Sequence, residues 1–77
     1  MDIQLADVTL HIDQSLNTEE LEKLEIAIRK KEGVISVHID TKKNHLVVVE
    51  YNPEMVHSGE LLEILHYQGL SGKLIGL

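Results

Sequence analysis

VTLHIDQSLNTEE, residues 8–20, is the stretch from which the fold can be predicted. Its first half alternates apolar and polar side chains, which is typical of a strand with one face in a core. Its second half places Asn17 three residues ahead of Glu20 at the start of an apolar-periodic run, close to a capping box. A helix N-terminus carries unpaired N–H groups and the positive end of the helix dipole. The loop before it is therefore the first candidate site for anions, thiolates or metals.

The sequence on both sides of this stretch predicts six elements in all, four strands and two helices. The first helix has an apolar stripe at helical spacing and is followed by Gly33, an expected left-handed end residue. Ser58 is the expected N-cap of the second helix, and Gly69 its end. We expect a loose lead-in over residues 1–7, strands over 8–13, 34–40, 45–51 and 73–77, and helices over 18–31 and 58–68.

The order strand, helix, strand, strand, helix, strand predicts an α+β fold of the ferredoxin-like type. In that fold a four-stranded antiparallel sheet, in the order 4-1-3-2, carries both helices on one face through right-handed crossovers. A chain of 77 residues has room for one domain, so we expect a single domain over residues 1–77. Its hydrophobic content of 43% and charged content of 26% are typical of an ordinary globular domain.

The chain contains no cysteine, which excludes disulfides, thiolate metal sites and cysteine nucleophiles. The net charge of −6 and the absence of Phe and Trp argue against nucleic acid as a partner. Phosphate contacts need clustered Lys and Arg, and base stacking needs aromatic platforms. Apolar runs fall far short of the roughly 20 residues that span a bilayer, and the N-terminus lacks a signal-peptide pattern. We therefore expect a cytoplasmic protein without membrane insertion, or a domain of a larger protein.

Three motifs occur in a fixed order: GVISV at 33–37, VEYNP at 49–53, and ELL at 60–62 with Gly69 after it. In this order the chain resembles the heavy-metal-associated (HMA) domain over residues 8–76. That family includes small copper chaperones, the periplasmic mercury-binding protein and the N-terminal modules of heavy-metal P-type ATPases. The resemblance implies the ferredoxin-like fold and a role linked to heavy-metal transport. It also implies a protein partner, either a heavy-metal P-type ATPase or a second copy of the chain.

The resemblance fails at the family's metal-binding motif, G-M-x-C-x-x-C. Counted back from Gly33, its two cysteines would fall on Asn17 and Glu20, so C-x-x-C is replaced by N-T-E-E. An amide and a carboxylate are hard oxygen donors, whereas Cu(I) needs soft sulfur ligands. The position that the family gives to a Lys, Tyr or Phe beside the metal is Leu70 here. The soft-metal chaperone function is therefore not expected.

Two interpretations of the altered loop stay open. In the first, the loop has become a well-capped helix start, because an Asn cap stabilises a helix by about 1 kcal/mol over Ala. In the second, Asp13, Asn17 and Glu20 form a site for a hard cation, although they lack the ligand spacing of an EF-hand loop.

The five histidines suggest a metal site of another kind, for a Zn, Cu or Ni ion. His11 and His38 should both point to the uncovered face of the sheet, but with a strand between them. Two strand spacings are about 10 Å, and zinc holds each imidazole at about 2 Å. These two residues are thus not expected to share an ion within one molecule, and His11 or His38 would have to bridge two molecules. The other histidines show no ligand spacing.

Catalysis is not expected, because no nucleophile–base–orienter set is recognisable from residue spacing. The acylphosphatase type of this fold needs an Arg in its first loop, but Arg29, the only Arg, lies late in the first helix. Leu46 and Val48 should lie on the uncovered sheet face with His11 and His38, forming a partly apolar interaction surface. The expected function is a non-enzymatic interaction or regulatory module associated with heavy-metal transport. The alternative is a metal-ion-binding protein with His and carboxylate ligands, including a site across a dimer interface.

Overall fold

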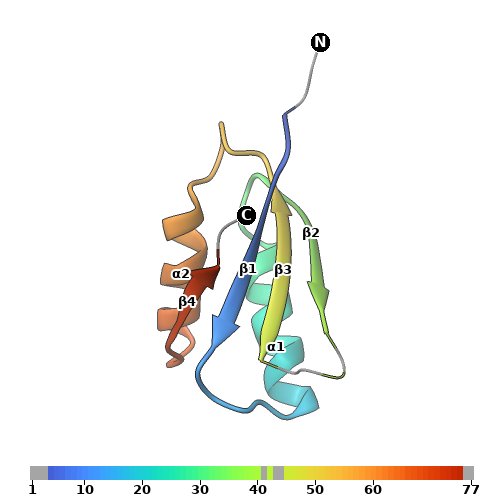
Figure 1. The fold of residues 1–77 in the computed structure, drawn as a ribbon, viewed down its shortest axis with the longest axis vertical. Coiled ribbons are helices and arrows are strands. Elements are labelled where there is room, and N and C mark those ends of the chain that lie inside the picture. Colours follow the sequence, from blue (N-terminus) through green and yellow to red (C-terminus); the bar gives the residue numbers. More distant parts are fainter. Residues whose placement is uncertain (1–3, 41, 43–44, 76–77) are drawn as a thin grey trace.

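A computed structural model describes residues 4–40, 42 and 45–75 of the chain (Figure 1). Four antiparallel strands form one sheet in the order β2-β3-β1-β4, and Figure 1 shows α1 and α2 together behind it. The predicted ferredoxin-like fold and strand order are confirmed. The elements are β1 (Ala6–Ile12), α1 (Thr18–Arg29), β2 (Val34–Ile39), β3 (Leu46–Tyr51), α2 (Ser58–Tyr67) and β4 (Gly72–Ile75).

The first strand begins earlier than predicted. Ala6 pairs with Tyr51 and Asp7 with Glu50, so the prediction of a loose lead-in was wrong for these two residues. The strand also ends one residue early, at Ile12, and the N–H of Asp13 donates to the carbonyl oxygen of Ser71 at 2.8 Å. The lead-in prediction for residues 1–3 lies outside the described residues.

Helix α1 differs from the prediction at its C-terminal end, whereas α2 differs at its N-cap and also ends at Tyr67, one residue before the predicted end. Helix α1 ends at Arg29, because the N–H of Lys31 bonds to the carbonyl of Ile28, an i−3 contact that tightens the last turn. Gly33 has the predicted left-handed backbone, at φ +99°. Ser58 was wrongly predicted as an N-cap: it is the first residue of α2, and His57 occupies the cap position without a side-chain hydrogen bond.

The second to fourth strands also differ slightly from the prediction. Strand β2 ends at Ile39 and β3 begins at Leu46, one residue inside the predicted limits. Strand β4 starts at Gly72, and residues 76–77 of the predicted strand lie outside the described residues. A Cβ at Gly72 would collide with the backbone carbonyl of His11, so glycine is what lets β4 approach β1.

The core lies between the sheet and the two helices. Alternate strand residues and one face of each helix supply it, as the two periodicities predict. Val47 in β3 is fully buried, whereas its neighbour Val48 is 39% exposed. The buried residues are Val8, Leu10, Ile12, Leu16, Leu24, Ile28, Val37, Val47, Val49, Tyr51, Val56, Leu61 and Leu65. The predicted assignment of β3 residues to the two faces is therefore confirmed. Neither of the two helices described is long and apolar enough to cross a membrane.

Candidate functional site

The loop between β1 and α1 ends in a complete capping box. The Oδ1 of Asn17 accepts a hydrogen bond from the backbone N–H of Glu20 at 2.8 Å. In return, the Oε1 of Glu20 accepts from the backbone N–H of Asn17 at 3.1 Å. Two helix-terminal N–H groups are thereby satisfied by the side chains at the two positions where the family resemblance places cysteines. The predicted helix start is confirmed.

A second set of hydrogen bonds ties this loop to the segment before β4. The Oγ of Ser71 donates to the carboxylate of Asp13 at 3.0 Å and accepts from the side-chain amide of Gln14 at 3.1 Å. The Oε1 of Gln14 accepts from the backbone N–H of Ser71 at 3.1 Å. Gln14 and Ser71 are far apart in sequence and show no motif, so these contacts could not have been predicted from spacing.

The three oxygen donors considered for a hard cation are thus engaged in other contacts. Asp13 contacts Ser71, while Asn17 and Glu20 cap the helix. Among the described residues, no group of three or more His, Cys, Asp or Glu side chains is close enough to hold a metal ion. Leu70 is partly buried and lines a small cavity of about 260 Å³ together with Glu20, Lys23, Leu24 and Gln68. The hard-cation interpretation stays a prediction.

The capping box leads to a stability prediction. Asn17→Ala removes the acceptor for the N–H of Glu20 and should lower the free energy of unfolding by about 1 kcal/mol. The change is measurable as a lower urea midpoint at an unchanged slope. Asn17→Ser, which keeps an acceptor oxygen at the N-cap, is the matched control and should lose a few tenths of a kcal/mol at most. Equal losses in the two variants would contradict the capping role.

Two rows of side chains on the face of the sheet opposite the helices carry the histidines of that face. In register across β2, β3, β1 and β4, the first row is His38, Val48, Thr9 and Ile75. The second row is Leu46, His11 and Lys73. His11 and His38 therefore share the face, as predicted, but β3 lies between their strands and they stand in different rows. The structure does not bring these two histidines together.

Instead, the structure brings His11 against His45. The two ring centroids are 5.1 Å apart with the rings inclined at 67°. The third strand was predicted to begin at His45, where alternation would point this side chain to the face opposite His11. In the structure His45 precedes β3, so alternation does not apply to it. Its backbone still contacts β1, because the N–H of Ile12 donates to its carbonyl at 2.8 Å. The contact between His11 and His45 could have been predicted from the pairing register of β1 with β3.

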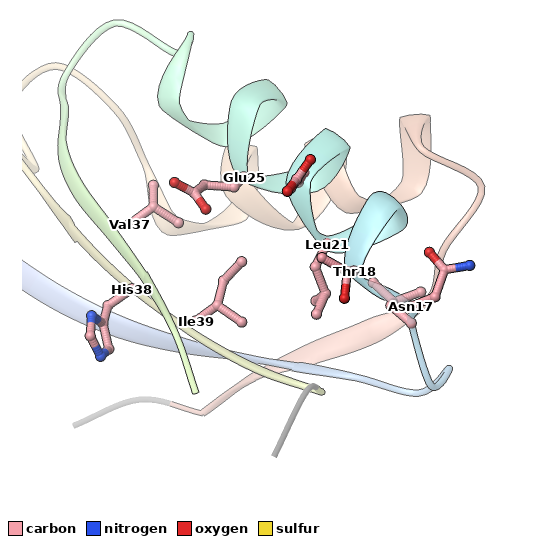
Figure 2. A pocket seen from close by; sticks show the side chains of 9 residues that line it. Asn17, Thr18, Leu21, Glu25, Val37, His38 and Ile39 are labelled. Carbon is pink, nitrogen blue, oxygen red and sulfur yellow. The ribbon is translucent and has the colours of Figure 1, made fainter. Parts of the chain in front are cut away.

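A groove runs between α1 and the edge strand β2, with a volume of about 600 Å³ (Figure 2). Figure 2 shows Val37 and Ile39 pointing from β2 toward α1, while His38 points away from the helix. Besides these residues it is lined by Leu16, Asn17, Thr18, Leu21, Glu22 and Glu25. The groove thus has apolar walls and two carboxylates on its helix side, of which Glu25 pairs with Arg29 at 2.6 Å. Sequence reasoning did not predict it.

No model of a known protein family matches the chain, and no curated protein matches it. Solved structures do match, among them the N-terminal domain of a potential copper-translocating P-type ATPase from Bacillus subtilis in the Cu(I)-loaded state. It has a TM-score of 0.84 and 25% identity, covering 95% of this chain and 90% of that one.

Two further matches have the same architecture. The yeast copper transporter domain CCC2A gives a TM-score of 0.81 at 20% identity, covering 92% of this chain and 96% of that one. Oxidized MerP from Ralstonia metallidurans CH34 gives 0.82 at 20% identity, covering 92% and 97%. The fold of this chain is therefore that of the heavy-metal-associated domain, as the motifs predicted.

Proposed function

We propose that this chain is a non-enzymatic protein-interaction module of the HMA fold, cytoplasmic and regulatory, that acts in heavy-metal transport without holding a soft metal ion at its first loop. Three facts support this. Its structural neighbours include domains of copper transporters. The two family cysteine positions hold Asn17 and Glu20, whose oxygens cap a helix. The sequence contains no cysteine at all. A fold does not determine function. The link to metal transport therefore rests on structural similarity, and the interaction role is argued from the surface of the chain.

The observation that carries the proposal is the apolar centre of the uncovered sheet face. Val48 is 39% exposed and Ile75 is 44% exposed in one row, with Thr9 between them, and Leu46 lies in the next row. No helix among the described elements covers this face (Figure 1). Apolar area removed from water contributes roughly 25 cal/mol per Å². An apolar centre with a polar rim is the usual anatomy of a protein interface.

The charges around this face indicate the chemistry of the partner. Asp7 and Glu50 are cross-strand neighbours at one end of it, and the carboxylate of Glu50 accepts a hydrogen bond from Ser36 at 3.4 Å. At the β2 edge, His38 also lines the α1–β2 groove, which carries Glu22 and Glu25. A partner with an apolar patch ringed by Lys and Arg would complement this surface. A second copy, also at −6, would be repelled over long range. The likeness of this chain to the N-terminal domain of a potential copper-translocating P-type ATPase makes a soluble domain of a heavy-metal P-type ATPase the partner that we propose.

The test is an NMR titration of the labelled chain with purified soluble domains of a heavy-metal P-type ATPase from the same organism. We expect shifts at residues of the two rows, and at least tenfold weaker binding for Val48→Lys, which is about 1.4 kcal/mol. Ile26→Lys is the matched control, because Ile26 is an exposed apolar residue of α1, 55% exposed. Its Kd should not change.

Two results would redirect or reject the proposal. Shifts of the same rows that depend on the concentration of the chain alone would make a second copy the partner. Equal Kd values for natural chain and Val48→Lys would reject the sheet face as the docking surface.

A further inference from the structure

The contact between His11 and His45 leaves one polar atom unexplained. The Nδ1 atom of His11 is buried and has no hydrogen-bond partner within the described part of the chain. Buried polar atoms are normally paired, so such an atom calls for a physical reason. The cross-strand neighbours of His11 are Leu46 in β3 and Lys73 in β4, and the ring beside it belongs to His45.

The separation of the two rings matches that of two imidazoles bound to one metal ion. A metal–nitrogen bond is about 2.0–2.1 Å, and the ring centre lies about 1.1 Å beyond the nitrogen, so two imidazoles at a tetrahedral angle have centroids about 5 Å apart. The observed separation is 5.1 Å. Their backbones are held in this relation by the hydrogen bond from Ile12 N–H to the carbonyl of His45.

We propose that His11 and His45 form a two-histidine site for a divalent transition-metal ion, at the end of the open sheet face where β1 ends and β3 begins. Neutral imidazole favours Cu(II), Ni(II) and Zn(II), with Cu(II) bound most tightly in the general order of affinities. The described residues offer no third His, Cys, Asp or Glu to complete the site, so water fills the remaining positions. The net charge of −6 attracts a cation to the protein, while Lys73 opposite His11 opposes it locally.

This site differs from the one implied by the family resemblance. It lies on β1 and ahead of β3, whereas the first-loop positions Asn17 and Glu20 lie at the N-terminus of α1. It also differs from a shared site of His11 and His38, which stand in different rows with β3 between their strands. Ion binding at this site is independent of the proposed docking, because it involves only the isolated chain and an ion.

The experiment is a titration of the isolated natural chain with Cu(II), followed by calorimetry and by NMR line broadening, and repeated with Zn(II). We expect one ion per chain, broadening centred on His11 and His45, and at least tenfold weaker binding for His45→Gln. His38→Gln, on the same face, and His66→Gln, on α2, are the matched controls and should bind within twofold of the natural chain. His11→Gln in the His45→Gln background should cause no further loss, since the chelate is already broken.

The inference is overturned if His45→Gln binds as the natural chain does. It is also overturned if all single-histidine variants lose affinity equally, or if broadening centres away from the pair. NMR spectra of each variant verify the fold, and His45 lies outside the strands, so its variant tests the site even if His11→Gln does not fold.

Discussion

The double variant Asn17→Cys/Glu20→Cys is expected to bind one Cu(I) ion per chain at the first loop, where the natural chain is expected to bind none. Each of the two side chains already reaches the backbone N–H of the other residue across the first turn of α1, at 2.8 and 3.1 Å. Thiolates in their place would be soft ligands for Cu(I). The helix N-terminus would stabilise them as anions. Anaerobic competition with a chromophoric Cu(I) chelator measures the effect.

The matched control is Asn17→Ser/Glu20→Ser, which has oxygen where the test variant has sulfur. The serine variant should not remove Cu(I) from the chelator. Both double variants lose the Glu20 half of the capping box, and the cysteine variant loses the Asn17 acceptor as well, so stability should fall by about 1 kcal/mol. Copper transfer to the serine variant, or none to a folded cysteine variant, would show that the chemistry of positions 17 and 20 is not what separates this chain from its metal-binding structural neighbours.

The second large effect concerns the core. Val47→Ala should lower the free energy of unfolding by about 2–3 kcal/mol, from the lost burial of two methyl groups plus the cavity left behind. Val47 is fully buried in β3. A domain of this length is stabilised by only about 4–12 kcal/mol. The loss is therefore a large fraction of the total, and urea denaturation followed by circular dichroism should show a clearly lower midpoint.

Val48→Ala is the control for this measurement, because it makes the same chemical change one residue along the same strand. Val48 is 39% exposed, so its substitution should cost no more than about 0.5 kcal/mol. Any loss of strand propensity is common to both variants and cancels in the comparison. Similar losses in the two variants would mean that the two faces of β3 have been assigned wrongly.

The order of the elements and their inward faces could be predicted because they depend on local patterns. Alternation in β3 separates buried Val47 from exposed Val48, and the Asn17–Glu20 spacing predicts the capping box of α1. Element ends were less predictable, because they depend on contacts with distant residues. Ala6 and Asp7, for example, belong to β1 because they pair with Tyr51 and Glu50 of β3.

The candidate sites likewise combine features that the sequence determines with contacts that only the tertiary structure determines. The absence of cysteine and the oxygen donors at positions 17 and 20 are properties of the chain, and they rule out a thiolate site before any fold is known. The contacts of His11 with His45 and of Gln14 with Ser71, like the groove between α1 and β2, join segments that no spacing rule connects. Local periodicity determines which elements form and which faces are apolar, but strand pairing and helix packing alone decide which distant side chains meet.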